Sequence, residues 1–261
     1  MKRLVHILPL LGAFLFLISC EEETPKKQKQ YRPLRIEEVA YKRELVYNPA
    51  GQVIRVISES VMPDKEVIST IQEFEYSNEG RMTTSVIDNE RRYQYMWEGD
   101  RIVKTEELVN GIATNRFTFS YRANGQIKEM LTYVYDGATP RLKGKVAYAF
   151  DPSGNLSSVT EFSFHETALY LETINEFDRY DSHPSIDSYF DFHVLNTGMH
   201  LHKNNPGRMV SKNKNGVAYA IEDYTYDYNT DGYAVKRETT LTFLHVGSTG
   251  SYETHYFFEE F

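Results

Sequence analysis

Six glycines with the same surroundings constrain the fold of this chain more than any other feature of its sequence. An aromatic residue lies four positions before each glycine, and a second large apolar residue lies six positions before it. The glycines are Gly51, Gly80, Gly99, Gly125, Gly154 and Gly232, and the residues four before them are Tyr47, Tyr76, Tyr95, Tyr121, Phe150 and Tyr228. Because side chains two apart on a β-strand point to the same side, each pair predicts a strand with an aromatic face that ends just before the glycine.

The residues between each aromatic and its glycine are typical of tight turns. Asn48-Pro49-Ala50-Gly51 and Asp151-Pro152-Ser153-Gly154 place Asn or Asp first, Pro second and Gly fourth. That order favours a type I turn followed by a residue with positive φ, which is a hairpin loop. Around Gly99 the next apolar residue slips by one position to Ile102, which predicts a tighter turn there.

Most intervals between the glycines accommodate two strands of about ten residues with their turns. Residues 178 to 207 lose the alternation, and we expect an insertion or a degenerate repeat there. The sequence therefore predicts an all-β fold, a long antiparallel β-meander of about a dozen or more strands built from repeated hairpins. A flat sheet would expose its edges and one apolar face, so we expect it to be twisted and curled toward a barrel-like or folded-over sheet.

The aromatic rows have two interpretations. Cross-strand aromatic pairs stabilise neighbouring strands, so the rows are expected to form the core. The alternative is an exposed platform, on which sugar rings or a partner protein would stack. The opposite strand positions carry charged residues such as Arg55, Glu75, Lys104 and Lys128, which argues against a wall that faces lipid.

The N-terminal segment predicts export and attachment to a membrane. Lys2 and Arg3 precede an apolar stretch that reaches Ile18, which is typical of a signal peptide over residues 1–19. Leu17-Ile18-Ser19-Cys20 resembles the bacterial lipobox, which implies that Cys20 carries the lipid. Residues 20–35 are then the acylated cysteine and a flexible tether, and residues 36–261 are the β-domain. Because Cys20 is the only cysteine, the fold contains no intramolecular disulfide.

Charge and motifs exclude several functions. The chain has 37 acidic and 29 basic residues and no long basic run, which argues against binding of nucleic acid. It lacks a Gly-x-Ser-x-Gly motif and a phosphate-binding glycine loop, so we expect no cofactor and favour a protein that is not an enzyme.

Two clusters contain side chains that could bind a metal ion. The first has four histidines within 20 residues, namely His183, His193, His200 and His202, beside several aspartates. If residues 200 to 202 form a strand, His200 and His202 share a face and could hold one metal ion. The alternative is a polar loop without a ligand. The second is residues 227–238, which have the ligand spacing of a calcium loop, although their flanks predict strands rather than helices.

Several segments together resemble known families. Tyr121-Arg122-Ala123-Asn124-Gly125-Gln126-Ile127 is similar to the YD repeats of RHS proteins. With the lipobox and residues 180–184, 204–206 and 224–233, the chain resembles a group of uncharacterised Bacteroidetes lipoproteins, a domain of unknown function. The resemblance implies a long β-meander and no known activity.

We therefore expect a non-catalytic lipoprotein of the outer membrane that is anchored through Cys20, with display on the cell surface as the favoured orientation. Its expected partner is a glycan or a protein at the cell surface. The alternative is a hydrolase or a metal-dependent enzyme that uses residues 178–207.

Overall fold

The strands of this protein form one closed β-barrel. A computed structural model describes residues 31–186 and 201–260, and within these ranges it contains sixteen strands. The strands are β1 (Tyr31–Glu38), β2 (Tyr41–Tyr47), β3 (Val53–Val61), β4 (Val67–Tyr76), β5 (Met82–Ile87), β6 (Arg91–Glu98), β7 (Arg101–Val109), β8 (Ile112–Tyr121), β9 (Ile127–Asp136), β10 (Thr139–Phe150), β11 (Leu156–His165), β12 (Ala168–Asp178), β13 (Arg208–Asn213), β14 (Ala218–Tyr228), β15 (Ala234–Phe243) and β16 (Ser248–Glu260). The described residues include no helix long and apolar enough to cross a membrane.

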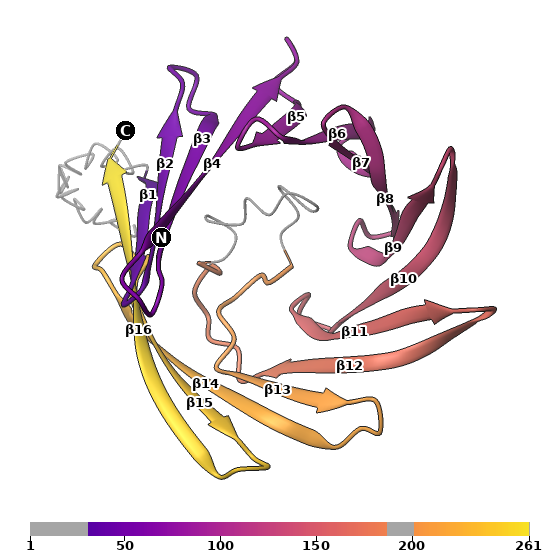
Figure 1. Cartoon of the computed structure of the whole chain (residues 1–261). Helices are drawn as coiled ribbons and strands as arrows, with labels where there is room; N and C mark the ends of the chain where they lie inside the picture. The colour runs from indigo at the N-terminus through magenta and orange to yellow at the C-terminus, as the bar shows by residue number, and fades with distance from the viewer. Residues whose placement is uncertain (1–30, 187–200, 261) are drawn as a thin grey trace, which may run out of the picture.

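Each strand pairs antiparallel with its neighbours in the sequence, and β1 pairs with β16 to close the ring (Figure 1). The prediction of an all-β antiparallel meander that curls into a barrel is therefore confirmed. Closure removes the free edges that a flat sheet would expose. The seam pairs Tyr31 with Glu260, so residues 31–35, which were expected in the tether, are part of the wall.

The glycine turns all lie at one end of the barrel. Successive hairpins alternate between the two ends, and the six glycines follow the even-numbered strands β2, β4, β6, β8, β10 and β14. Both ends of the wall and the link from β12 to β13 lie there too. We call this the repeat end and the opposite end the mouth. All six glycines have positive φ, from 60° to 91°, which is the conformation that the turn pattern predicts. The tighter turn at Gly99 is also confirmed, because β6 ends at Glu98 and β7 begins at Arg101.

The residues before the glycines form the hydrophobic core. The side chains six positions before the glycine are buried on β2, β4, β6, β8 and β10, and they are Leu45, Phe74, Tyr93, Phe119 and Tyr148. Tyr47, Tyr76, Tyr121 and Phe150 pack against this cluster and are partly buried. The aromatic rows therefore point inward and form the core, as expected, and the exposed platform is wrong.

Aromatic side chains also tie each hairpin to the previous one. The Tyr76 hydroxyl donates to the Val53 carbonyl at 2.6 Å, and the Tyr121 hydroxyl donates to the Ile102 carbonyl at 2.6 Å. In the unit of Gly99, Trp97 takes this role and donates to the Met82 carbonyl at 2.7 Å. The prediction that Tyr95 is equivalent to the tyrosines four positions before the other glycines is therefore wrong. The tighter turn at Gly99 shifts the register by two residues, so Trp97 takes that position.

The outer wall is charged. Arg55 pairs with Glu73 at 2.8 Å, and Arg208 pairs with Asp223 at 2.6 Å, both across neighbouring strands. Lys212 contacts Glu176 at 2.6 Å in the same way. A lipid-facing barrel presents a continuous apolar band, whereas ion pairs of this kind favour contact with water.

Candidate functional site

One segment enters the barrel and covers its repeat end. Residues 179–186 and 201–207, which we call the floor segment, connect β12 to β13 and run in the middle of the ring (Figure 1). Its two arms pair with each other, because the Ser185 amide donates to the Lys203 carbonyl at 3.0 Å and Pro184 forms a β-bridge with Asn204. Ile186 is buried in the hydrophobic core. The floor segment is therefore packed into the barrel rather than exposed outside it.

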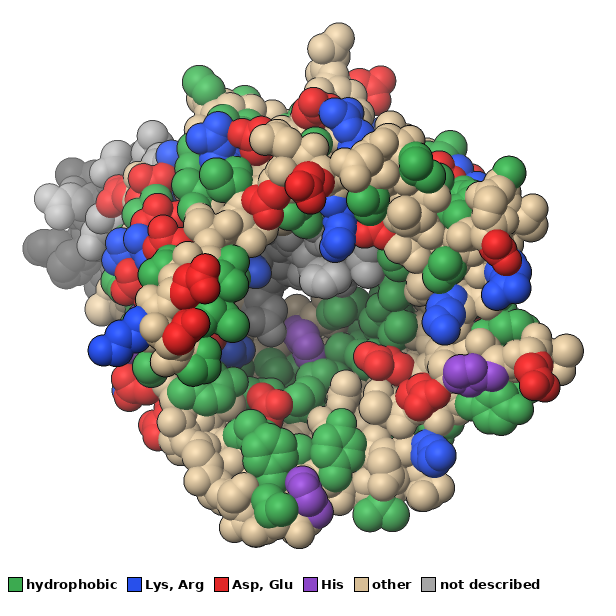
Figure 2. All heavy atoms as spheres, viewed as in Figure 1, with side chains coloured by type: hydrophobic (Ala, Val, Ile, Leu, Met, Phe, Trp, Pro, Cys, Tyr) green, Lys and Arg blue, Asp and Glu red, His purple; other side chains and the backbone are tan. Residues whose placement is uncertain are grey.

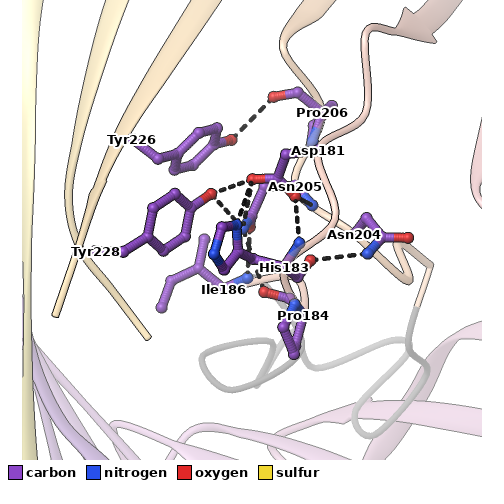
Figure 3. A network of polar contacts seen from close by, with 9 residues as sticks. All are labelled: Asp181, His183, Pro184, Ile186, Asn204, Asn205, Pro206, Tyr226 and Tyr228. Carbon is purple, nitrogen blue, oxygen red and sulfur yellow. Dashed lines mark hydrogen bonds and ion pairs between the residues drawn. The ribbon is translucent and has the colours of Figure 1, made fainter. Parts of the chain in front are cut away.

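Asn205 is the central polar residue of the floor segment (Figure 3). Its side chain is fully buried. The side-chain oxygen accepts from the Ile186 amide at 2.7 Å, while the amide nitrogen donates to the Pro184 carbonyl at 3.2 Å. Because buried backbone groups need partners, this side chain supplies the hydrogen bonds that a strand neighbour would otherwise provide.

Asp181 and Tyr228 bind the floor segment to β14 (Figure 3). The Asp181 carboxylate accepts from the Tyr228 hydroxyl, and it also accepts from the backbone amides of His183 and Asn205. The His183 ring stacks on Tyr228 with centroids 3.8 Å apart. Burial and the hydrogen bond to Asp181 raise the pKa of Tyr228, so the hydroxyl stays protonated and keeps donating.

The other arm contacts the turn between β10 and β11. The Asn204 amide donates to the Asn155 side chain at 2.9 Å, and the Tyr180 hydroxyl donates to the Leu156 carbonyl. Tyr180 thus makes the hydroxyl-to-carbonyl contact that Tyr76 and Tyr121 make in the regular units. Sequence reasoning missed this role because no glycine lies four residues after Tyr180.

The structure gives ring partners to the predicted histidine ligands that it describes. The His202 Nδ1 atom lies 2.9 Å from the Tyr180 hydroxyl, and its ring packs on Phe177. His183 stacks on Tyr228, as described above. No group of three or more His, Cys, Asp or Glu residues in ranges 31–186 and 201–260 is arranged to hold a metal ion. His193, His200 and Cys20 lie outside the described residues.

The calcium-like spacing of residues 227–238 belongs to a hairpin. Asn229 accepts from the amides of Asp231 and Tyr233 through its side-chain oxygen, at 3.1 and 2.9 Å. The Asp231 carboxylate accepts from the Tyr31 hydroxyl across the seam at 3.0 Å. These contacts are those of a turn between β14 and β15, and the helices that a calcium loop of this kind needs are replaced by strands.

Above the floor segment the middle of the barrel is hollow and is lined partly by hydrophobic side chains (Figure 2). Directly paired residues on neighbouring strands share a face, so rows of partners can be followed around the wall. One inward-facing row climbs from the core to the mouth and consists of Tyr95, Thr105, Phe117, Thr132, Gly144, Ser163 and Tyr170. Along this row the lining changes from aromatic residues near the repeat end to threonine, glycine and serine, and Tyr170 ends the row at the mouth.

A carboxylate inside the barrel is fully engaged. Glu107 is buried and accepts from the hydroxyls of Tyr93 at 2.8 Å and Thr114 at 3.0 Å. Arg91 lies 3.3 Å from it. Burial alone would raise the pKa of Glu107, but hydrogen bonds from Asn115, Tyr93 and Thr114 outweigh burial and hold the pKa below its usual range. Glu107 is therefore ionised at neutral pH and is not suited to donate a proton as a general acid.

The mouth carries exposed apolar side chains that point inward. Tyr170 is 54% exposed and Ile68 is 47% exposed, while Val134 and Phe243 are each 39% exposed. Each of them is paired with an inward-facing residue of the next strand. They lie on β12, β4, β9 and β15, and so surround the opening. This arrangement suits binding of a molecule that enters through the mouth.

No family model matches this chain, and no curated protein matches it either. Two of the matching solved structures are similar along most of both chains. A porin-like protein from Bacteroides uniformis has 11% identity and a TM-score of 0.60, and the match covers 88% of this chain and 96% of that one. A porin-like protein from Bacteroides vulgatus has 14% identity and a TM-score of 0.49, with 88% and 99% covered.

A Photorhabdus luminescens Tc holotoxin pore has 10% identity and a TM-score of 0.26, and the match covers 84% of this chain but 12% of the toxin chain. At 11% identity, the match to the Bacteroides uniformis protein shows a similarity of fold alone. This chain shares its fold with that porin-like protein, and the resemblance to uncharacterised Bacteroidetes lipoproteins stays a prediction.

Proposed function

We propose that this protein is a lipid-anchored envelope protein whose barrel is a non-catalytic cup for a ligand. The observation that carries the proposal is the difference between the two ends of the barrel interior. The repeat end is filled by the core and the floor segment, whereas the mouth is lined by exposed apolar and polar side chains. A container that is closed at one end and open at the other suits binding better than passage through the barrel.

The predicted anchor gives the cup an orientation. Tyr31 begins the wall at the repeat end. Cys20 lies eleven positions before it, and a stretch of that length spans at most roughly 36–40 Å when fully extended. A lipid on Cys20 would therefore hold the repeat end toward the membrane and turn the mouth away from it.

The outer wall supports a barrel that stands in water. The ion pairs between Arg55 and Glu73 and between Lys212 and Glu176 lie on the face opposite the core. Burying such pairs in hydrocarbon would be unfavourable, whereas on a water-facing wall they are ordinary. In this proposal the lipid, rather than the barrel wall, attaches the protein to the envelope.

The described residues do not favour the alternative of an enzyme. Glu107 is held ionised by its hydrogen bonds. His183 and His202 are both engaged with aromatic rings. A hydrolase or a metal enzyme would need such groups directed at an open site.

Replacing the proposed lipid attachment site tests the anchor. The Cys20→Ala variant should move from the membrane fraction to the soluble fraction after cell lysis and centrifugation. A matched Ser19→Ala variant keeps the cysteine and should stay in the membrane fraction. Unchanged fractionation of Cys20→Ala would contradict the anchor and leave the cup to be judged separately.

Filling the interior tests the cup. Ser163 faces inward on β11, and its neighbour Phe162 faces outward and contacts Lys145. Thermal unfolding of the full-length protein in detergent would be followed with neutral, anionic and acyl-chain ligands. We expect a stabilising ligand for the native protein, loss of the effect in Ser163→Trp, and retention of it in Phe162→Trp. The cup is wrong if no ligand of any class stabilises the protein, or if Ser163→Trp binds as the native protein does.

A further inference from the structure

We infer that the ligand of this cup is a neutral oligosaccharide. The inference rests on the proposed cup and identifies what it binds. Four properties of the inward-facing residues carry it: aromatic rings at the mouth, hydroxyl and amide groups below them, buried polar atoms that need partners, and charges of both signs rather than of one.

The aromatic rings lie at the mouth. Tyr170 is the most exposed of the inward-facing aromatic residues, and its ring lies 5.8 Å from that of His165 near the tip of the β11–β12 hairpin. Phe243 is exposed at the start of the β15–β16 turn. A sugar ring presents C–H groups on one face and packs on an aromatic ring, which itself offers apolar area at a low entropic cost. The two residues are therefore suited to receive the ends of a chain of sugars.

The lining below the rim contains many hydroxyl and amide groups, with Glu161 and Arg43 as charged neighbours. On β11 and β12 the inward positions include Ser163, Thr173 and Asn175, and on β9 they include Thr132. On the opposite side of the ring, β3 and β4 contribute Ser58, Ser60 and Thr70. Such groups both donate and accept, which matches the many hydroxyls of a sugar.

Some polar atoms deeper in the wall have no hydrogen-bond partner within the described part of the chain. They are the Gln72 amide nitrogen and the hydroxyls of Thr105 and Thr239, on side chains at least nine-tenths buried. All three point inward from β4, β7 and β15. A buried polar atom without a partner is costly, so the interior favours an occupant that forms hydrogen bonds. An acyl chain cannot supply them.

The charges inside the barrel argue against a charged ligand. Glu107 is paired with Arg91 and is saturated with hydrogen bonds. Glu222 accepts from the Tyr224 hydroxyl at 3.0 Å, and Glu38 accepts from the Thr254 hydroxyl at 2.8 Å. Arg43 faces inward as the partner of Ser58, and its guanidinium group lies over the Tyr41 ring. Arg237 faces inward as the partner of Thr254, and its guanidinium group lies over the Tyr224 ring. An anionic ligand would need an excess of cationic side chains, whereas this interior carries charges of both signs.

The test measures binding by isothermal titration calorimetry of the full-length protein in detergent. The probes are maltohexaose, cellohexaose, xylohexaose and mannohexaose as neutral sugars, with hexagalacturonate as an anionic sugar and dodecanoate as an acyl chain. We expect saturable binding of at least one neutral hexaose and none of hexagalacturonate or dodecanoate. Tyr170→Ala should weaken that binding roughly tenfold, the loss of one aromatic stacking contact.

Leu169→Ala is the matched control. Leu169 is the neighbour of Tyr170, faces outward on the same strand and is also exposed, so its replacement should leave affinity unchanged. Dodecanoate or hexagalacturonate binding that depends on Tyr170, without binding of a neutral hexaose, would overturn the sugar assignment while the cup stands. No binding by any of the six probes overturns the sugar assignment. Equal losses in Tyr170→Ala and Leu169→Ala would also overturn it, because the effect would then come from the fold.

Discussion

The repeat end and the mouth are built from the same sixteen strands, and they differ in what the strands do with their inward-facing positions. At the repeat end these positions are aromatic, buried and tied to the backbone by tyrosine hydroxyls. At the mouth they are apolar, polar or charged, as Ile68, Ser163 and Arg141 show, and many are exposed. The floor segment adds to this contrast. It packs into the repeat end, where the core lies, and the interior above it is hollow (Figure 2).

The turns of the two ends differ less. The six repeat turns use glycine where φ is positive. The turns at the mouth use both kinds of residue there: Gly111, Gly137, Gly216 and Gly247 have positive φ, and so do Lys65, Asp88, Asn89, Asn110 and Glu166. Asn and Asp tolerate this conformation, so Lys65 and Glu166 are the mouth residues at which it is most strained.

The largest expected difference in stability is between a core residue at the repeat end and an inward-facing residue at the mouth. Leu156 is 1% exposed at the repeat end, so Leu156→Ala should lower the free energy of unfolding by about 2–5 kcal/mol. Ile68 points inward at the mouth and is half exposed, so Ile68→Ala should lower it by less than about 1 kcal/mol. Urea denaturation of both variants measures the difference. Equal losses would show that the mouth is as tightly packed as the repeat end.

Replacement of Asn205, the central polar residue of the floor segment, should give the second largest loss of stability. Asn205→Ala leaves the Ile186 amide and the Pro184 carbonyl without their partner and should lower the free energy of unfolding by about 2–3 kcal/mol. Ser163→Ala, at the half-exposed lining of the mouth, should lower it by no more than about 0.5 kcal/mol. Chemical denaturation again compares them, and a harmless Asn205→Ala would mean that the floor segment does not stabilise the barrel.

The tyrosine contacts predict a dependence on alkaline pH. Burial raises the pKa of Tyr76 and of Tyr121 to about 12, whereas tyrosine in the unfolded chain ionises near its ordinary value of 10. The fold thus favours the neutral hydroxyls, and this stability is complete below pH 10 and is lost as the pH rises toward 12. Tyr76→Phe should cost about 1 kcal/mol at neutral pH and make the loss at high pH smaller.

Urea midpoints at pH 8 and at about pH 11 measure this effect. The native protein should lose more stability between the two values than Tyr76→Phe does. The same loss in both proteins would show that the Tyr76 hydroxyl does not titrate with unfolding.

The smallest effects come from the turns. Gly154 has φ of 90°, so Gly154→Ala should destabilise the protein by about 1 kcal/mol. Glu166 has φ of 54° at the mouth, so Glu166→Gly should be neutral or stabilise it by a few tenths of a kcal/mol, at roughly the level of the strain it relieves. Thermal unfolding measures the stability of the two variants. If both substitutions destabilise the protein, the expected difference between the two turns is wrong.

Some parts of this architecture could be predicted from residues close together in the sequence. The spacing of two between Phe74 and Tyr76 defines a strand face, and Gly80 defines the turn that follows. Tyr95 shows the limit of that reasoning, because the two-residue turn at Gly99 gives its role to Trp97. Tyr180 shows a second limit, since the repeat glycine that would mark it is absent and its carbonyl partner, Leu156, is 24 residues away.

The sequence by itself determined the class of the fold, the position of most hairpins and the inward direction of the aromatic rows, because alternation and turn chemistry act over a few residues. Only the tertiary structure decided that β1 pairs with β16, that the floor segment packs inside, and that Gln72, Thr105 and Thr239 point into one interior. These features depend on contacts between residues far apart in the chain, and local sequence patterns do not show which distant strands pair.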